Sequence, residues 1–231
     1  MNMEMEIQRF KMELLRKFPF YGDVMMHLPF VASQKVETAA TDGKTIWYNP
    51  TFMASMGQGE RNFVLMHELL HILLRHGVRS ANKKRDRDVW NVACDIIVNN
   101  MLSEMFYQMK VMEIPFAKPS AGIFAKTTPD ETVENLYEKI MAENPSKNKF
   151  SKKLKIKRYY TSGRFIGENV QEVDIPADIK TFNLSPEELQ INDRMIRELI
   201  CTSLKKNQGL MGSIPIPAEI YNLAEGRPLD W

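Results

Sequence analysis

The segment from about residue 60 to residue 75 constrains the fold most, because it is apolar around almost its whole helical circumference. Its apolar residues are Phe63, Val64, Leu65, Met66, Leu69, Leu70, Ile72, Leu73 and Leu74. A helix of this kind is buried on nearly all sides. The same segment carries His67, Glu68 and His71, and polar groups in such a place need partners that offset their desolvation. We therefore expect a buried helix whose polar side chains are held by a metal ion.

The spacing of the two histidines fits this expectation. His67 and His71 are four residues apart, so they project from one face of a helix and can reach one tetrahedral Zn²⁺. Glu68 lies beside them in the HExxH pattern, where its carboxylate can act as general base on a metal-activated water. The chain has four histidines, and three of them, His67, His71 and His76, lie within ten residues. The competing interpretation is a purely structural helix with two histidines and a surface Glu.

A catalytic zinc site takes three protein ligands and leaves one position open, so a third ligand is needed. We favour Asp95, which lies on a second helix expected from Asp86 or Asp88 to about Tyr107. Asp95 belongs to a polar stripe, with Asn91 and Asn99 at positions i, i+4 and i+8, on an otherwise apolar helix. The alternative for Asp95 is a hydrogen-bonding role behind a ligand.

His76 is the alternative third ligand. On an unbroken helix it would lie about 140° around the axis from His71, so it can bind the same ion only if the helix breaks first. Leu73-Leu74-Arg75 contains neither Gly nor Pro to make that break, and Gly77 is well placed to cap the helix. In the structural interpretation, His76 lies at the helix C-terminus, where partial positive charge is favourable.

Periodicity and turn signals predict the remaining elements. We expect helices over residues 3–17, from Pro129 to Met141 with Thr128 as N-cap, over about 186–206 with a capping box of Ser185 and Glu188, and from Pro217 to Leu223. Residues 35–49 predict a β-hairpin with a type I′ turn at Asp42-Gly43. Residues 18–30 are expected to form a packed loop or a short helix.

Length and charge favour one domain over residues 1–231, with a core of about 1–143, a basic loop at 144–167 and a C-terminal helical part at 168–231. Residues 144–158 hold seven Lys or Arg and no acid, whereas the whole chain carries a net charge of only +2. A solvated loop is favoured over a nucleic-acid-binding segment there.

Several patterns exclude whole classes of protein. No apolar run is long enough to span a membrane, and the acidic N-terminus MNMEMEIQRF does not fit a signal peptide. Cys94 and Cys201 provide no disulfide framework, which suits a reducing compartment. We therefore expect a cytoplasmic protein that does not act at a membrane.

The motif HELLHILLRH, followed about twenty residues later by DVWNVACDIIVNNML, resembles the metal-dependent peptidases of zincin type that usually precede a von Willebrand factor A-like domain. TDGKTIWYNPTF and AGIFAKTTPDETVENLYEKI are also similar, so the resemblance covers most of residues 20–140. It implies an α+β, mainly helical zincin-like domain with a small β-hairpin or sheet beside the HExxH helix. It also implies His67 and His71 as ligands and Glu68 as base. It does not decide between Asp95 and His76.

The expected function is that of a zinc-dependent metallopeptidase acting on a peptide or protein substrate. The alternative is a metal-binding, non-proteolytic module that recruits clients to an AAA-type ATPase. The resemblance implies such an ATPase and a von Willebrand factor A-like domain as partners. Because the chain ends at Trp231, about where that domain would begin, we expect a shortened or stand-alone version.

Catalysis would need further groups. Tyr48, Arg75, His76, Arg79 and Tyr107 are all candidate donors to the oxyanion. The strand Thr45–Tyr48 could pair with an extended peptide, although an aromatic strand is more often part of the core.

Overall fold

The computed structural model describes residues 2–81, 85–120, 122–125, 127–128, 131–144, 153–158, 169–174, 184–209 and 216–224. The helices are α1 (Met3–Lys17), α2 (Pro19–His27), α3 (Pro50–Ala54), α4 (Gln58–Leu73), α5 (His76–Ala81), α6 (Arg87–Glu104), α7 (Phe106–Val111), α8 (Val133–Glu143), α9 (Pro186–Lys206) and α10 (Ala218–Ala224). The strands are β1 (Phe30–Ala32), β2 (Ala39–Thr41), β3 (Ile46–Tyr48), β4 (Lys153–Arg158) and β5 (Asn169–Asp174).

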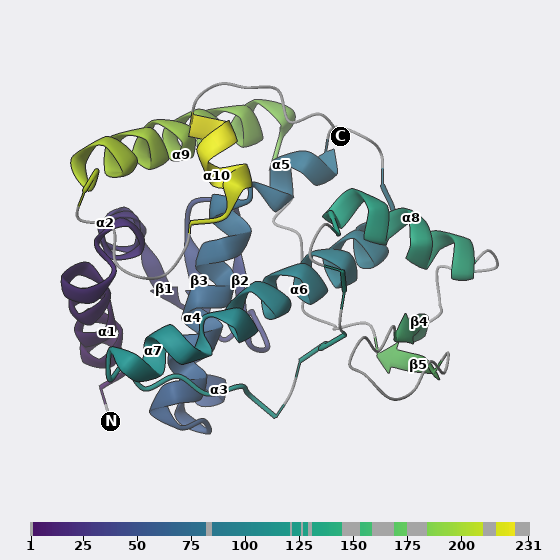
Figure 1. The fold of residues 1–231 in the computed structure, drawn as a ribbon, viewed down its shortest axis with the longest axis horizontal. Coiled ribbons are helices and arrows are strands. Elements are labelled where there is room, and N and C mark those ends of the chain that lie inside the picture. The colour runs from purple at the N-terminus through teal and green to yellow at the C-terminus, as the bar shows by residue number, and fades with distance from the viewer. Residues whose placement is uncertain are drawn as a thin grey trace.

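Helix α4 runs through the centre of the molecule, and α6 crosses it (Figure 1). One hydrophobic core joins α4 to α1, α2, α9 and the strands β1, β2 and β3, and a second core lies between α6 and α8. Phe63, Leu69, Leu70 and Leu73 of α4 are at most 2 % exposed. The expected buried helix is therefore confirmed, and so is the α+β class with a small sheet beside this helix. No helix in the described ranges is long and apolar enough to cross a bilayer.

The small sheet has the order β1-β3-β2, with β1 parallel and β2 antiparallel to β3. The predicted hairpin is thus present as β2 and β3. The predicted type I′ turn is wrong, because only Gly43 of the two central residues has a positive φ, +94°. Asp42 instead accepts hydrogen bonds through Oδ1 from the amides of Lys44 and Thr45, at 3.0 and 2.7 Å. This side chain stabilises a longer loop.

Several predicted helix ends agree with the structure. Helix α1 covers residues 3–17, and the capping box of Ser185 and Glu188 opens α9 at Pro186. Helix α8 differs, because the side chain of Thr132, not Thr128, accepts a hydrogen bond from the amide of Asn135 and caps the helix. Pro129 lies outside the described residues.

The basic segment expected as a loop contains strand β4, which pairs antiparallel with β5. Apart from β4 and Asn144, residues 144–167 lie outside the described ranges. Strand β5 also lies within the part, 168–231, that was expected to be helical. Lysine occupies every second position at the start of β4, and this alternation is typical of a strand. The prediction of a loop considered only the number of charges and not their alternation.

The carboxylate of Asp23 ties α9 to α2. Asp23 is 3 % exposed, and it accepts hydrogen bonds from Ser203 Oγ at 2.6 Å and from Lys206 Nζ at 2.5 Å. Burial raises the pKa of Asp23, but the hydrogen bonds from Lys206 and Ser203 outweigh burial and hold this pKa below its ordinary value. A lowered folded-state pKa stabilises the fold above the unfolded-state pKa, and this stabilisation is lost as the pH falls through the folded-state pKa.

We expect Asp23→Asn to lower the free energy of unfolding at pH 7 by about 1–3 kcal/mol. The difference between variant and wild type should shrink once the pH falls below about 4, where the Asp23 carboxyl of the unfolded chain begins to protonate, and should vanish below the lower folded-state pKa. Urea denaturation at several pH values measures both effects. Glu198→Gln, on the exposed side of α9, is the control and should change little. An equal loss for Asp23→Asn at all pH values would contradict the role of the charge.

Candidate metal centre

Hydrogen bonds near their N-terminal ends position α4 and α6. Glu60 Oε2 accepts a hydrogen bond of 2.9 Å from the Gly57 amide at the start of α4, and Asn62 Nδ2 donates to the Pro115 carbonyl at 2.8 Å. Asp86 caps α6 by accepting from the Val89 amide at 3.1 Å. Of the two predicted starts of the second helix, Asp86 and Asp88, the structure has Asp86 as the cap. The crossing of α4 and α6 then brings polar side chains of both helices together.

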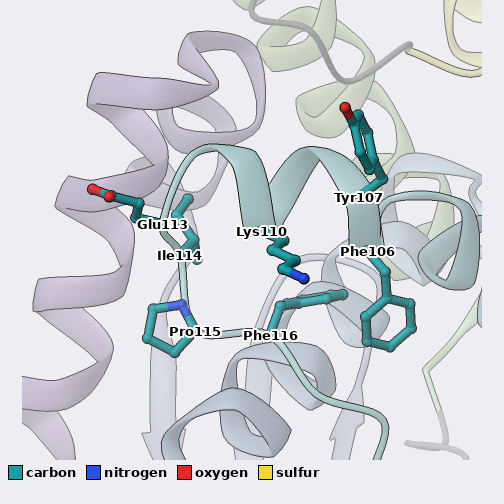
Figure 2. Close-up of a pocket in the computed structure, with 7 residues that line it drawn as sticks. All are labelled: Phe106, Tyr107, Lys110, Glu113, Ile114, Pro115 and Phe116. Carbon is teal, nitrogen blue, oxygen red and sulfur yellow. The ribbon is translucent and has the colours of Figure 1, made fainter.

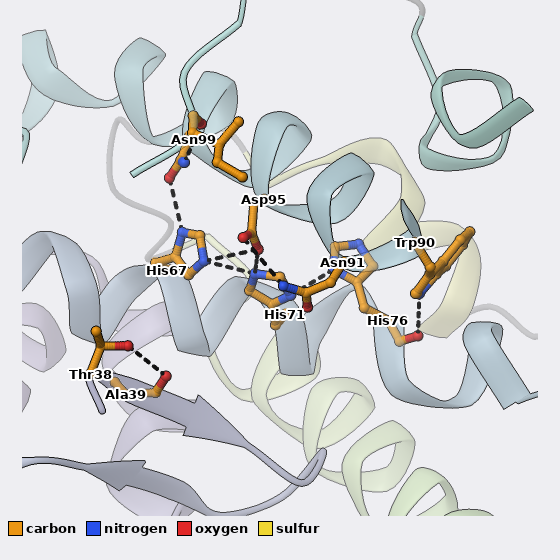
Figure 3. A network of polar contacts seen from close by, with 10 residues as sticks. Thr38, Ala39, His67, His71, His76, Trp90, Asn91, Asp95 and Asn99 are labelled. Atoms are coloured by element: carbon orange, nitrogen blue, oxygen red, sulfur yellow. Dashed lines mark hydrogen bonds and ion pairs between the residues drawn. The ribbon is translucent and has the colours of Figure 1, made fainter. Parts of the chain in front are cut away.

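Three potential ligand atoms meet at this crossing (Figure 3). His67 Nε2 lies 2.8 Å from His71 Nε2, and Asp95 Oδ1 lies 3.2 Å from His71 Nε2 and 3.5 Å from His67 Nε2. Ligand atoms of a tetrahedral zinc ion are about 3.3 Å apart, given Zn–N and Zn–O distances of about 2.0–2.1 Å. The observed spacing therefore fits such an ion. These three residues form the potential metal-binding group found in the described part of the chain.

Nδ1 of His67 faces away from this group, and its hydrogen bond fixes the tautomer of the His67 ring. His67 Nδ1 lies 2.9 Å from Asn99 Oδ1, while Asn99 Nδ2 donates to the carbonyl of Ile123 at 2.7 Å. Because the amide oxygen can only accept, His67 Nδ1 carries the proton and its Nε2 keeps a lone pair. That lone pair points toward His71 Nε2, and two lone pairs at 2.8 Å repel unless a proton or a cation lies between them. This arrangement fits a bound cation.

The carboxylate of Asp95 is held in the ionised form that a metal ligand needs. Burial raises the pKa of Asp95, but hydrogen bonds and charge from His67 and His71 outweigh burial and lower this pKa to about 2. Asn91 Nδ2 makes a long contact of 3.4 Å with Asp95 Oδ2, the oxygen that does not face the histidines. The polar stripe of the sequence thus faces the site along its whole length. The orienting roles of Asn91 and Asn99 were not predicted, although the stripe itself was the signal.

Burial lowers the pKa of His67, but Asp95, the neighbouring charge of Glu68 and the hydrogen bond to Asn99 together raise this pKa above its ordinary value. Glu68 itself is 8 % exposed. The side chains of His67, His71 and Asp95 are 17, 10 and 15 % exposed, so the cluster is not sealed inside the core.

The helix ends before His76, which corrects the sequence expectation. Helix α4 stops at Leu73, and Arg75 takes the left-handed conformation with φ 56°. Gly77, the expected cap, instead lies inside α5. A left-handed residue other than Gly costs about 1–2 kcal/mol. The guanidinium of Arg75 is bound by the Asp193 carboxylate of α9, a contact from far along the chain that no local pattern could indicate.

The break places His76 behind His71. His76 Nδ1 lies 3.0 Å from His71 Nδ1, the nitrogen that faces away from His67 and Asp95. Burial lowers the pKa of His76 well below its ordinary value, and the nearby charges of His71 and Arg79 lower it further. His76 thus contacts His71 from behind, whereas Asp95 lies within the cluster. This geometry favours Asp95 as the third ligand.

The other candidate donors are placed less favourably. Arg75 is paired with Asp193, and Arg79 is paired with Glu134, with Nη2 at 2.6 Å from Oε2. Tyr48 is 4 % exposed in β3. Tyr107 is 74 % exposed and lines a surface hollow with Phe106, Lys110, Glu113, Ile114, Pro115 and Phe116 (Figure 2). None of the three clustered residues lines this hollow.

Comparison with known proteins identifies the family of this chain. A protein of Thermotoga maritima named "Uncharacterized protein" is 26 % identical over 110 residues, which are 46 % of this chain and 28 % of that protein. The chain thus spans less than a third of this relative. No solved structure matches. The sequence profile of one family covers residues 3–199, a range that includes the whole cluster. The chain belongs to this family, which is described as "Putative metallopeptidase domain".

Proposed function

We propose that this protein is a zinc-dependent metallopeptidase in which His67, His71 and Asp95 hold the ion and Glu68 is the general base. The observation that carries this proposal is the convergence of two Nε2 atoms and one carboxylate oxygen within 3.5 Å of one another. Two nitrogens and one oxygen form the ligand set of hydrolytic zinc sites with an open fourth position. Bound there, zinc supplies Lewis acidity and an acidified water.

The residues of the chain supply the rest of the chemistry. Glu68 follows His67 directly, so its carboxylate can take a proton from the attacking water and return it to the leaving amine. Asn99 holds His67 in the tautomer that ligation needs, and Asn91 contacts the outer oxygen of Asp95. Orienting partners of this kind keep ligands in place while the substrate changes shape.

Among the described strands, β2 offers an edge to an extended substrate, whereas the expected strand Thr45–Tyr48 does not. β3 is the central strand, because β1 and β2 pair with its two sides. The Thr38 carbonyl accepts from the Asn49 amide, and the Asp42 amide donates to the Thr45 carbonyl, so both groups turn toward β3. Alternation along a strand then turns the backbone groups of Ala39 and Thr41 toward the open edge. Since β2 packs on α4, a peptide added to this edge would lie beside the HExxH helix.

The decisive experiment combines metal analysis with a cleavage assay. The purified protein is expected to hold about one zinc per chain by elemental analysis and to cleave members of a random peptide library, read by mass spectrometry. Chelation should remove both zinc and cleavage, and added zinc should restore both. Full zinc occupancy without any cleavage would refute the peptidase function. Absence of zinc binding would refute the site as well.

Two further expectations continue as proposals. The chain has two cysteines, Cys94 and Cys201, far apart in the sequence, and so few cysteines support a reducing, cytoplasmic location. The family resemblance supports an AAA-type ATPase and a von Willebrand factor A-like domain as partners. Co-purification of such an ATPase with the tagged protein would test the partnership.

A further inference from the structure

We infer that His76 is a positioning residue that fixes the tautomer and ring orientation of His71, so that the Nε2 lone pair of His71 faces the metal. This inference rests on the proposed zinc site and deepens it. The starting observation is the 3.0 Å contact between the Nδ1 atoms of the two rings, which meet edge-on with an interplanar angle of 82°. Two ring nitrogens at this distance form a hydrogen bond only when one of them carries a proton.

Only one direction of this hydrogen bond permits metal binding. A neutral His71 that ligates through Nε2 carries its proton on Nδ1 and donates it to His76 Nδ1. If His76 were the donor, the proton of a neutral His71 would sit on Nε2 and point at His67 and Asp95. That proton would occupy the position of the ion. The acceptor role of His76 therefore selects the binding-competent form of His71.

The far nitrogen of His76 indicates that this contact is not a by-product of ordinary packing. With Nδ1 as acceptor, the proton of His76 resides on Nε2, and Nε2 is a buried atom without a hydrogen-bond partner in the described part of the protein. Buried polar atoms are nearly always paired in folded proteins. A buried histidine with one satisfied nitrogen, directed at the ring of a ligand, points to a functional constraint on that contact.

The backbone around His76 is built to hold it in this place. The left-handed Arg75 ends α4 and turns the chain, and the Arg75–Asp193 ion pair binds this turn to α9. Trp90 Nε1 of α6 donates to the His76 carbonyl at 3.0 Å, and the two rings lie edge to face (Figure 3). A residue held in a sparsely populated conformation by contacts on two sides is a common mark of a functional position.

Each of the three proposed ligands then has a polar partner that contacts it from outside the ligand group. His67 is oriented by Asn99, Asp95 is contacted by Asn91, and His71 is oriented by His76. A ligand histidine usually donates its second N–H to a carboxylate, a backbone carbonyl or water. An imidazole acceptor in this place is unusual, and it explains why the third histidine of the cluster lies next to the site without belonging to the ligand group.

The test uses two substitutions, each of which places a polar atom at the position of a different ring nitrogen of His76. In His76→Asn, the amide oxygen can occupy the position of Nδ1 and accept from His71. In His76→Gln, the amide oxygen reaches the position of Nε2 and the Nδ1 acceptor is lost. We expect zinc affinity, measured by competition with a chromophoric chelator, to stay within about threefold of wild type in His76→Asn and to fall about 10–100-fold in His76→Gln. The absorption spectrum of the cobalt-substituted protein should change only in His76→Gln.

Controls separate positioning from folding and from ligation. Far-ultraviolet circular dichroism and thermal unfolding of the metal-free variants identify any folding defect, and His76→Leu is a second variant that lacks the acceptor. His27→Asn, at the histidine outside the cluster, should leave zinc affinity unchanged. Equal affinity in wild type, His76→Gln and His76→Leu would overturn the inference while leaving the zinc site intact. A loss in His76→Asn as severe as in His71→Ala would identify His76 as a ligand. A wild-type protein that binds no zinc would overturn the proposed function and this inference together.

Discussion

Glu68→Gln is expected to reduce peptide hydrolysis by about 10²–10⁴-fold while zinc remains bound. The amide has the size of the carboxylate but cannot accept the proton of the attacking water. Glu68 is adjacent to the ligand group and is not one of its three members, so the affinity for the ion should change little. Single-turnover cleavage of an identified peptide and zinc stoichiometry on the same sample measure the two effects separately.

The matched control for this substitution is Glu104→Gln, which changes an exposed glutamate at the end of α6. It should retain wild-type cleavage and wild-type zinc content. If Glu68→Gln binds zinc and still cleaves at the wild-type rate, Glu68 is not the base. If it binds zinc and preserves biological activity although no variant cleaves peptides, the non-proteolytic module that recruits clients to an AAA-type ATPase becomes the better account.

Asp95→Asn is expected to weaken zinc binding by about 10²–10⁴-fold. Zinc sites in proteins contribute about 10–16 kcal/mol of binding free energy, and one of three ligands carries roughly a third of that, with each 1.4 kcal/mol equal to a factor of ten. The amide keeps the shape of Asp95 but loses the charge that faces both histidines. Isothermal competition with a chelator measures the affinity. Thermal unfolding gives a second measurement, because zinc at about 100 times the dissociation constant stabilises the wild type by about 2.7 kcal/mol.

Comparison of Asp95→Asn with His76→Asn decides between the two candidate third ligands. With Asp95 as ligand, Asp95→Asn should resemble His71→Ala, and His76→Asn should remain close to wild type. The reverse order of affinities would assign the third ligand to His76. Circular dichroism of the metal-free variants measures their stability, and so separates a folding defect from a loss of zinc binding.

The sequence alone indicated the elements whose stabilising contacts are local. The range of α1 and the capping box of α9 depend on local residues, and both were predicted. The cap of α6 was narrowed to Asp86 or Asp88, and the structure has Asp86. The HExxH spacing and the stripe Asn91–Asp95–Asn99 were also predicted, because helical periodicity alone determines which side chains share a face. The Thr128 cap was wrong because Thr132, one turn later, offers the same hydroxyl chemistry.

The features that were missed depend on contacts between distant segments. The central position of β3 follows from the parallel pairing of β1, which lies outside the hairpin and leaves no mark on its pattern. The break at Arg75 depends on Asp193, which is 118 residues away. A local reading assigns the left-handed conformation to Gly or Asn, so it could not anticipate an arginine held there by an ion pair.

The sequence by itself determined which side chains could take part in an ion site. They are two histidines on one face of a buried helix, a glutamate beside them and an aspartate in the polar stripe of a second helix. The tertiary structure decided how they are used. The crossing of α4 and α6 brought Asp95 to the two histidines, and the turn at Arg75 put His76 behind His71. The physical reason is that periodicity sets directions within one helix, whereas the distance between helices is set by packing over the whole core.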